Sequence, residues 1–370
     1  MKSFTVSALG LLAALVPTAF AQTHTDCNPL NTTGCPSMQA LGGNVTFNWN
    51  KTGIPSDGKV WVKKNQGSID WVEKGATFTV ERSGDSPTAN SKFYMLFGRL
   101  EVVMKVANGK GIISSAILQS EALDEIDFEW KGSNSSILTN YFGKGDTTSY
   151  DRGEDFDLGF VPQDDFHNYT IDWTKDRIQW WVDGKKLREL LPADAKGGTR
   201  YPQTPMNIRL GIWAAGDVKN NDKGVIEWAG GETDFNQGPY TMTVKSVYAQ
   251  DYTQGAEYSW EDMDASGDWQ KVKVIAGKSK VLKEIQSPSG VHNRWAALPQ
   301  GAKIGIIAGS LGLFAVCCLI MAFCCVKQRR AGRKEHAALL AEEEKEAAEL
   351  QEYKLKMQNG KFGLGSYQRV

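Results

Sequence analysis

The sequence lacks a large net charge, a long internal repeat and sustained helical periodicity before Ile304. Its 370 residues include 42 basic and 43 acidic side chains, for a formal net charge of −1. Without a basic excess the chain has no electrostatic footprint for nucleic acid, so no nucleic-acid partner is predicted. The absence of an apolar period near 3.6 residues argues against a helical bundle before that point.

Cysteine is also scarce in the first part of the chain, where Cys27 and Cys35 are the only two. Lys2 and an apolar run over residues 6–20, ending in Ala19-Phe20-Ala21, predict a cleaved signal peptide at 1–21. In the oxidising compartment that a signal peptide implies, the two cysteines most simply form one disulfide. Five N-glycan sequons also fit an exported chain: Asn31, Asn44, Asn50, Asn134 and Asn168.

One long apolar segment, residues 304–326, contains 23 residues without a charge, enough to cross a bilayer. A basic cluster, from Lys327 to Lys334, follows at once and predicts a cytosolic C-terminal side. The prediction is a single-pass plasma-membrane protein whose main domain faces the cell wall and whose tail, 327–370, has an unknown partner. Residues 256–303 are predicted to be a strand extension and stalk.

Between these segments, residues 22–255 are rich in short runs of Val, Ile, Phe, Tyr and Trp separated by Gly, Asp and Asn. Asp183-Gly184, between two apolar runs, is a typical hairpin turn. This pattern predicts an all-β fold of two antiparallel sheets packed as a sandwich, in a domain large enough for a substantial core.

Residues 124–130, Asp-Glu-Ile-Asp-Phe-Glu-Trp, alternate acidic and apolar side chains over the length of a strand. Successive strand residues point to opposite faces, so Glu125, Asp127 and Glu129 share one face. Such a row is a solvated face, a calcium site or a catalytic site; Ile and Phe spacers disfavour a calcium loop. Catalysis fits glycoside cleavage, in which one carboxyl attacks the anomeric carbon and another protonates the leaving oxygen.

The Glu-Ile-Asp-Phe-Glu motif resembles the ExDxE signature of glycoside hydrolase family 16. The segments 139–145, 167–173, 178–184, 209–213 and 226–231 extend the resemblance, most closely to the fungal Crh transglycosylases that join chitin to β-glucan. The resemblance implies a β-jelly roll with Glu125 as nucleophile, Glu129 as acid/base and Asp127 hydrogen-bonded to the nucleophile. It implies a covalent glycosyl-enzyme and no cofactor or metal.

The same resemblance predicts substrate-binding residues. Arg209 and Trp213 share a strand face by alternation and look like chitin contacts of the Crh proteins. Val225 stands where many relatives have a threonine. The full predicted set, with the acid/base, is Glu129, Arg209, Trp213, Asn140, Tyr141, Phe142, Trp228 and Val225. The predicted partners are chitin, β-glucan and the lipid bilayer. The alternatives are a chitin or β-glucan hydrolase with the same site, and a non-catalytic carbohydrate-binding wall sensor.

Overall fold

The computed structural model describes residues 25–52, 58–149, 151–287, 295–296 and 298–358. The predicted signal peptide therefore lies outside the described residues. The chain divides into two compact units, Met1–Ser287 and Pro288–Val370. The first unit contains all the strands, and the second contains one long helix.

The first sheet of unit 1 carries the acidic motif near its centre. Its neighbours are antiparallel throughout. The strand order is β11 (Glu154–Asp157), β10 (Ser136–Phe142), β9 (Glu125–Lys131), β8 (Ile112–Ser120), β15 (Met206–Ala214), β6 (Thr88–Ser91) and β3 (Trp61–Lys64). The acidic strand β9 thus lies between β10 and β8, with β3 at the far edge.

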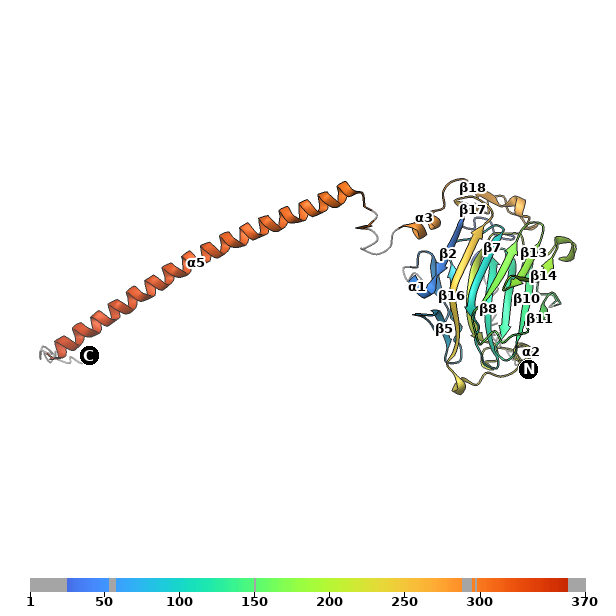
Figure 1. Cartoon of the computed structure of the whole chain (residues 1–370), viewed down its shortest axis with the longest axis horizontal. Helices are drawn as coiled ribbons and strands as arrows, with labels where there is room; N and C mark the ends of the chain where they lie inside the picture. The colour runs from blue at the N-terminus through green and yellow to red at the C-terminus, as the bar shows by residue number, and fades with distance from the viewer. Residues whose placement is uncertain (1–24, 53–57, 150, 288–294, 297, 359–370) are drawn as a thin grey trace, which may run out of the picture. The chain divides into compact units, whose positions relative to one another are not determined.

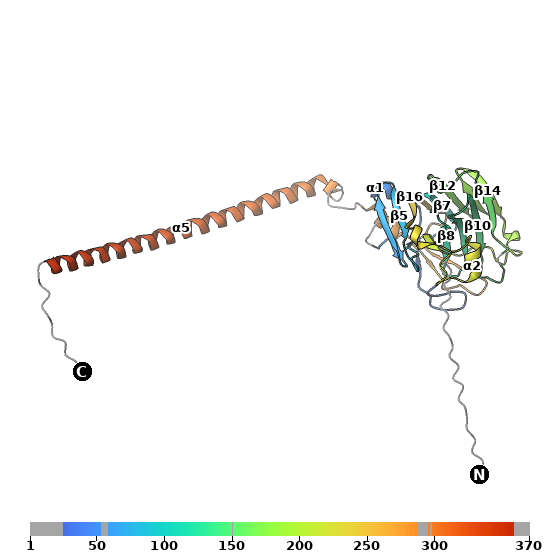
Figure 2. The same ribbon diagram turned by 90° about the horizontal axis from the view of Figure 1, so that it is seen from below.

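The second sheet is also antiparallel and stacks against the first (Figure 1 and Figure 2). Its order is β14 (Lys185–Leu190), β13 (Ile178–Val182), β12 (His167–Trp173), β7 (Gly98–Lys105), β16 (Tyr240–Asp251), β5 (Gly75–Val80) and β4 (Ser68–Val72), with β2 (Asn44–Asn48) also paired to β16. The prediction of an all-β antiparallel sandwich is confirmed.

Alternation along the strands builds the core between the sheets. Strand β7 alternates buried and half-buried residues along its whole length, with Leu100, Val102 and Met104 at most 1% exposed. Two side chains of the second sheet also hydrogen-bond the first: Trp180 Nε1 donates to Asp127 O at 3.0 Å, and Arg188 Nη1 donates to Thr139 O at 2.9 Å. The second sheet therefore hydrogen-bonds the backbones of the acidic strand β9 and of its neighbour β10, in addition to the pairing between the strands themselves.

Short helices interrupt the loops of unit 1. They are α1 (Trp49–Thr52), η1 (Pro192–Asp194), α2 (Lys223–Trp228), η2 (Phe235–Gln237) and η3 (Trp269–Lys271). Of these, α2 bears on the site, because it carries two of the predicted substrate-binding residues, Val225 and Trp228.

The segment predicted as a strand extension and stalk, 256–303, does contain strands, and the chain stays in the folded unit up to Ser287. A small third sheet joins β1 (Met38–Gln39), β17 (Glu257–Ser259) and β18 (Lys273–Ile275). Helix α3 (Lys280–Gln286) follows, with Val281 buried. Tyr258 is fully buried and donates a hydrogen bond to Asp251 at 2.6 Å. The segment is polar in composition, but its backbone forms strand pairs and its aromatic Tyr258 is buried. Its mixed composition alone does not indicate this.

Unit 2 consists mainly of helix α5 (Gln300–Gln358). Among the described residues this helix is the one long and apolar enough to cross a membrane, by length and composition. It contains the predicted span, 304–326, and continues without a break into the predicted tail as far as Gln358. The C-terminal helix is thus a candidate membrane anchor.

Candidate active site

Strand β9 sorts its side chains onto two faces, as the alternation predicts. The apolar set lies in the core, each member at most 1% exposed: Ile126, Phe128 and Trp130. Glu125 and Asp127 are buried on the other face, and Glu129 is half-buried. The neighbouring strand β8 is buried along its whole length, so the acids are largely covered and do not lie on an open surface.

The strand register places further polar residues beside each acid. Side chains of directly paired residues share a face. Glu125 is paired with Phe142 on β10 and with Gln119 on β8. Gln119 Nε2 donates a hydrogen bond to Glu125 Oε2 at 2.7 Å. A planar amide therefore orients the predicted nucleophile from the adjacent strand.

Asp127 lies between the two glutamates and is paired with Asn140 and with Ile117. Burial and the charges of Glu125 and Glu129 raise the pKa of Asp127 well above its usual value. Asp127 also shares a hydrogen bond with Glu125. A protonated Asp127 donates in that bond, and it stabilises negative charge on Glu125.

Glu129 is paired with Leu138 and with Ser115. Burial, and then the charge of Glu125, raise the pKa of Glu129 to about 8, against a smaller opposing effect from Lys131. The carboxyls of Glu125 and Glu129 are therefore close enough to interact. At neutral pH Glu129 keeps a proton, which is the state a general acid needs.

Glu125 has the best-supported charge of the three. Burial is the largest effect and raises its pKa overall, whereas the hydrogen bond from Asp127, the charge of Arg209 and the hydrogen bond from Gln119 reduce that rise. Arg209 lies on the same face, because it is paired with Ile117, the partner of Asp127. Glu125 thus has three neighbours that favour its charged form, and Glu129 has only Lys131, a contrast in the direction that the roles in a retaining glycosidase require.

The structure divides the predicted sugar contacts of β10. Asn140 and Phe142 are paired with Asp127 and Glu125 and lie on the acid face. Tyr141 is paired with Ile126 instead, is 4% exposed, and has the guanidinium of Arg188 5.6 Å from its ring centroid. The prediction that Tyr141 contacts sugar is wrong, because strand alternation turns it into the core.

The other predicted aromatics meet at one side of the cleft. Trp213 is paired with Ile113, the partner of Lys131. Its ring centroid is 6.4 Å from that of Trp228, with the planes 26° apart. Trp228 ends helix α2, and Lys131 Nζ lies 5.4 Å from its ring centroid. Val225 of α2 packs in the same small apolar cluster.

A cleft of about 640 Å³ lies beside the acids, over β8, β15, β6 and the edge strand β3. Its lining includes Ser115 and Ile117, the partners of Glu129 and Asp127, but not the three acids themselves. Arg209 lines it with several polar residues that the motifs did not reveal. They include Asn90, Asn207, Tyr94 and Glu121. Tyr94 Oη donates a hydrogen bond to Glu121 Oε1 at 2.7 Å, and Arg209 Nε donates to Asn207 Oδ1 at 3.1 Å. No local pattern marks these residues, because they are assembled by strand pairing.

Cys27 and Cys35 form a disulfide, as predicted. Of the predicted sequons, Asn31, Asn44 and Asn134 are exposed, whereas Asn50 and Asn168 are partly buried. Asn168 Nδ2 donates a hydrogen bond to Glu101 Oε2 at 3.2 Å. Among the described residues, no group of three or more His, Cys, Asp or Glu is arranged to hold a metal ion.

A sandwich with paired carboxyls of separated pKa in a polar, aromatic-walled cleft defines a glycosidase-type enzyme. A model of glycosyl hydrolases family 16 matches residues 56–230. A Crh-like protein of Arthroderma benhamiae is 49% identical over 333 residues, 89% of each chain. Crh-like protein 3 of Aspergillus fumigatus is 43% identical over 98% of each chain.

A solved structure described as Crh5 transglycosylase in complex with NAG is 48% identical and superposes with a TM-score of 0.62. The match covers 67% of this chain and 99% of the other. The chain therefore belongs to glycosyl hydrolase family 16, as a cell-wall transglycosylase of the Crh type. Its two-sheet sandwich is the jelly roll of that family.

Proposed function

We propose that this enzyme transfers a chain end between chitin and β-glucan with retention of configuration, through a covalent glycosyl-enzyme. Glu125 is the nucleophile and Glu129 the acid/base. The observation that carries the proposal is the contrast between Glu125, whose charge has three supporting neighbours, and Glu129, whose pKa is about 8.

In the first step, Glu125 attacks the anomeric carbon while Glu129 gives its proton to the leaving glycosidic oxygen. The C–O bond of the donor breaks as the bond to Glu125 forms. In the second step, Glu129, now a carboxylate, takes the proton of an acceptor hydroxyl, which attacks the anomeric carbon and releases Glu125. Asp127 supports the carboxylate state of Glu125 by its hydrogen bond.

A transferase has to hold an acceptor sugar better than it holds water. Phe142 and Trp213 supply flat apolar faces for sugar C–H surfaces, and Asn140 and Arg209 supply donors for hydroxyls. Trp228 and Val225 support Trp213 from helix α2. In the related Crh5 structure the bound group is NAG, the repeating unit of chitin, which supports a chitin chain as one partner.

We also propose that α5 spans the plasma membrane, with the catalytic unit facing the wall and the tail in the cytosol. The basic residues that follow Val326 support this orientation. A tag placed after Val370 should resist external protease on intact cells and become accessible after permeabilisation. Digestion on intact cells would contradict the proposal.

The test of the activity is product analysis. Full-length enzyme is incubated with chitin oligomers and a fluorescent β-glucan oligomer, and the labelled products are separated by size. Labelled products longer than the added β-glucan are expected, and they should be cleaved by chitinase. Products that are only shorter than the substrates would show a hydrolase instead.

A further inference from the structure

Helix α3 borders the cleft that lies beside the acids. The cleft extends from Ser115 and Ile117 of β8, next to the acidic strand, to Val62 of the edge strand β3. Val281 of α3 is one of its lining side chains. From β9 to β3 are four strand steps, about 19 Å across a sheet of ordinary spacing.

The position of α3 is fixed from both ends. Ser279 caps the helix, accepting a hydrogen bond from Leu282 N, and its hydroxyl donates to Ala40 O at 2.7 Å. Leu282 packs on Gly43 so closely that a methyl group added at Gly43 would lie 2.8 Å from Leu282 Cδ2. Ile285 also packs on the core. Helix α3 is therefore packed as part of the folded unit that contains the sheets.

A salt bridge joins α3 to the strand side of the cleft. Lys59 Nζ lies 2.6 Å from Glu284 Oε1, and the Lys59 side chain lines the cleft together with Val281. The cleft near β3 is therefore lined by an apolar side chain, Val281, and by a cationic donor, Lys59. An aliphatic side chain packs on the C–H surface of a sugar, and an ammonium group donates to its hydroxyls.

We propose that α3 is a wall of the glycan-binding cleft. It sets the oligomer length beyond which further sugar units no longer increase the affinity. Val281 and Lys59 contact the sugar unit that lies over β3, the unit most distant from the acids on that side. The proposal rests on the proposed function only in that the cleft holds a glycan. It adds a specificity element outside the segment, residues 56–230, that matches the family model.

The test measures binding as a function of glycan length. Full-length protein in detergent, carrying Glu125→Gln to prevent turnover, is titrated by calorimetry with chitin oligomers and with β-glucan oligomers of increasing length. Val281→Gln puts a longer polar side chain at the lining position of α3 in the cleft. It should leave the dissociation constant of short oligomers unchanged and weaken the longest ones of one series by about tenfold, equivalent to about 1.4 kcal/mol.

Lys59→Met is a second variant, at a side chain that is 56% exposed and safe for folding. It should weaken the same long oligomers by about threefold, a loss typical of a single partly exposed polar contact. Leu282→Ala is the matched control, because it loosens the Gly43 side of α3 without touching the lining. An equal change at all lengths in both series, or the same change in Leu282→Ala, would overturn the proposal.

A failure of the proposed function gives a different result. An active enzyme that makes no products longer than its substrates would refute chitin–glucan transfer, whereas the length dependence of binding would still be measurable. The two proposals can therefore fail separately.

Discussion

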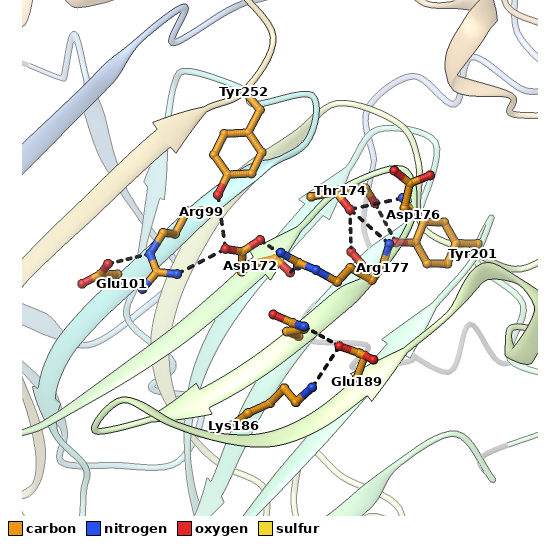
Figure 3. Close-up of polar contacts among 11 residues, drawn as sticks. Arg99, Glu101, Asp172, Thr174, Asp176, Arg177, Lys186, Glu189, Tyr201 and Tyr252 are labelled. Atoms are coloured by element: carbon orange, nitrogen blue, oxygen red, sulfur yellow. Dashed lines mark hydrogen bonds and ion pairs between the residues drawn. The ribbon is translucent and has the colours of Figure 1, made fainter.

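The two outward faces of the sandwich use the same strand geometry for opposite purposes. On the second sheet, Asp172 lies between two guanidinium groups, at 2.9 Å from Arg177 Nη1 and 3.2 Å from Arg99 Nη1, and Tyr252 donates to it (Figure 3). On the first sheet, carboxyls occupy successive positions of one strand face and repel one another. Pairing of opposite charges holds the second face together, whereas burial and like charges raise the pKa values of the acids on the first.

The pKa directions show the difference. Hydrogen bonds from Gln179 and Lys186 lower the pKa of Glu189 on the second sheet. Burial and a neighbouring acid raise that of Glu129 on the first. Carboxyls whose pKa is raised by burial and by neighbouring like charges are candidates for an active site. Carboxyls whose pKa is lowered by hydrogen-bond donors more often belong to a structural network.

The largest contrast should come from the acids themselves. Glu125→Gln and Glu129→Gln keep size and hydrogen-bonding capacity but remove a nucleophile or a proton donor, so each should lower kcat by about 10²- to 10⁴-fold. Asp127→Asn should be milder, because an amide still donates to Glu125. Transfer assays with circular dichroism measure this. Asp172→Asn is the control and should keep its kcat; near-normal turnover in either Glu variant would refute the assigned roles.

A smaller effect is expected at the aromatic wall. Trp213→Ala removes a stacking face and should weaken sugar binding by about 1–3 kcal/mol, by analogy with stacking on other flat ligands. The ratio of transfer to hydrolysis should fall with it. Binding calorimetry and melting curves separate the outcomes. A variant that melts far below the parent but binds chitin oligomers normally would show Trp213 to be a packing residue.

On the second sheet the sensitive quantity is stability. Asp172→Asn removes the carboxylate that pairs with Arg177 and one of the two that pair with Arg99, which keeps Glu101 at 2.7 Å. The Asp172 side chain is only 12% exposed. Hydrogen bonds to charged groups contribute about 1.5–3 kcal/mol, so we expect a loss of that order in the free energy of unfolding. Denaturant titration measures it. Unchanged stability would mean that solvent replaces the carboxylate fully.

The two faces should respond to pH with opposite signs. The pKa of Glu129 is raised from 4.5 to about 8, so its contribution to stability is complete below 4.5 and is lost as pH rises to about 8. Glu129→Gln should therefore gain stability relative to the parent over that range. Activity of the parent should fall above pH 8, as the acid loses its proton.

Glu189 provides the opposite case, with the smallest effect. Its pKa is lowered, so its contribution is present above the ordinary pKa and is lost as pH falls. Glu189→Gln should lose a little stability at neutral pH and none in acid. Melting temperatures of the three proteins across pH test both signs. If the melting temperatures of all three proteins changed in parallel with pH, the proposed electrostatic difference between the two faces would be refuted.

Local patterns were sufficient where the physics is local. The two-residue period of a strand assigns Glu125, Asp127 and Glu129 to one face without any knowledge of neighbours. An uncharged segment long enough for a bilayer is recognisable from composition alone. The disulfide follows from there being only two cysteines before the apolar segment 304–326.

Pairing between distant segments could not be deduced in this way. Tyr141 belongs to the core because it is opposite Ile126, whereas Phe142 is in the cleft because it is opposite Glu125. Gln119 acts on Glu125 through the same register. Residues 280–286 have a mixed composition, and only their packing shows that they belong to the folded unit, with Val281 lining the cleft beside the acids.

The amino-acid order by itself determined the sandwich class, the acidic face and the apolar anchor, because each follows from short-range periodicity or from composition. The tertiary structure decided which neighbours surround the acids, and therefore which carboxyl keeps its proton. A pKa depends on burial and on charges brought from other strands, and these are set only when β8, β9, β10 and β15 are aligned.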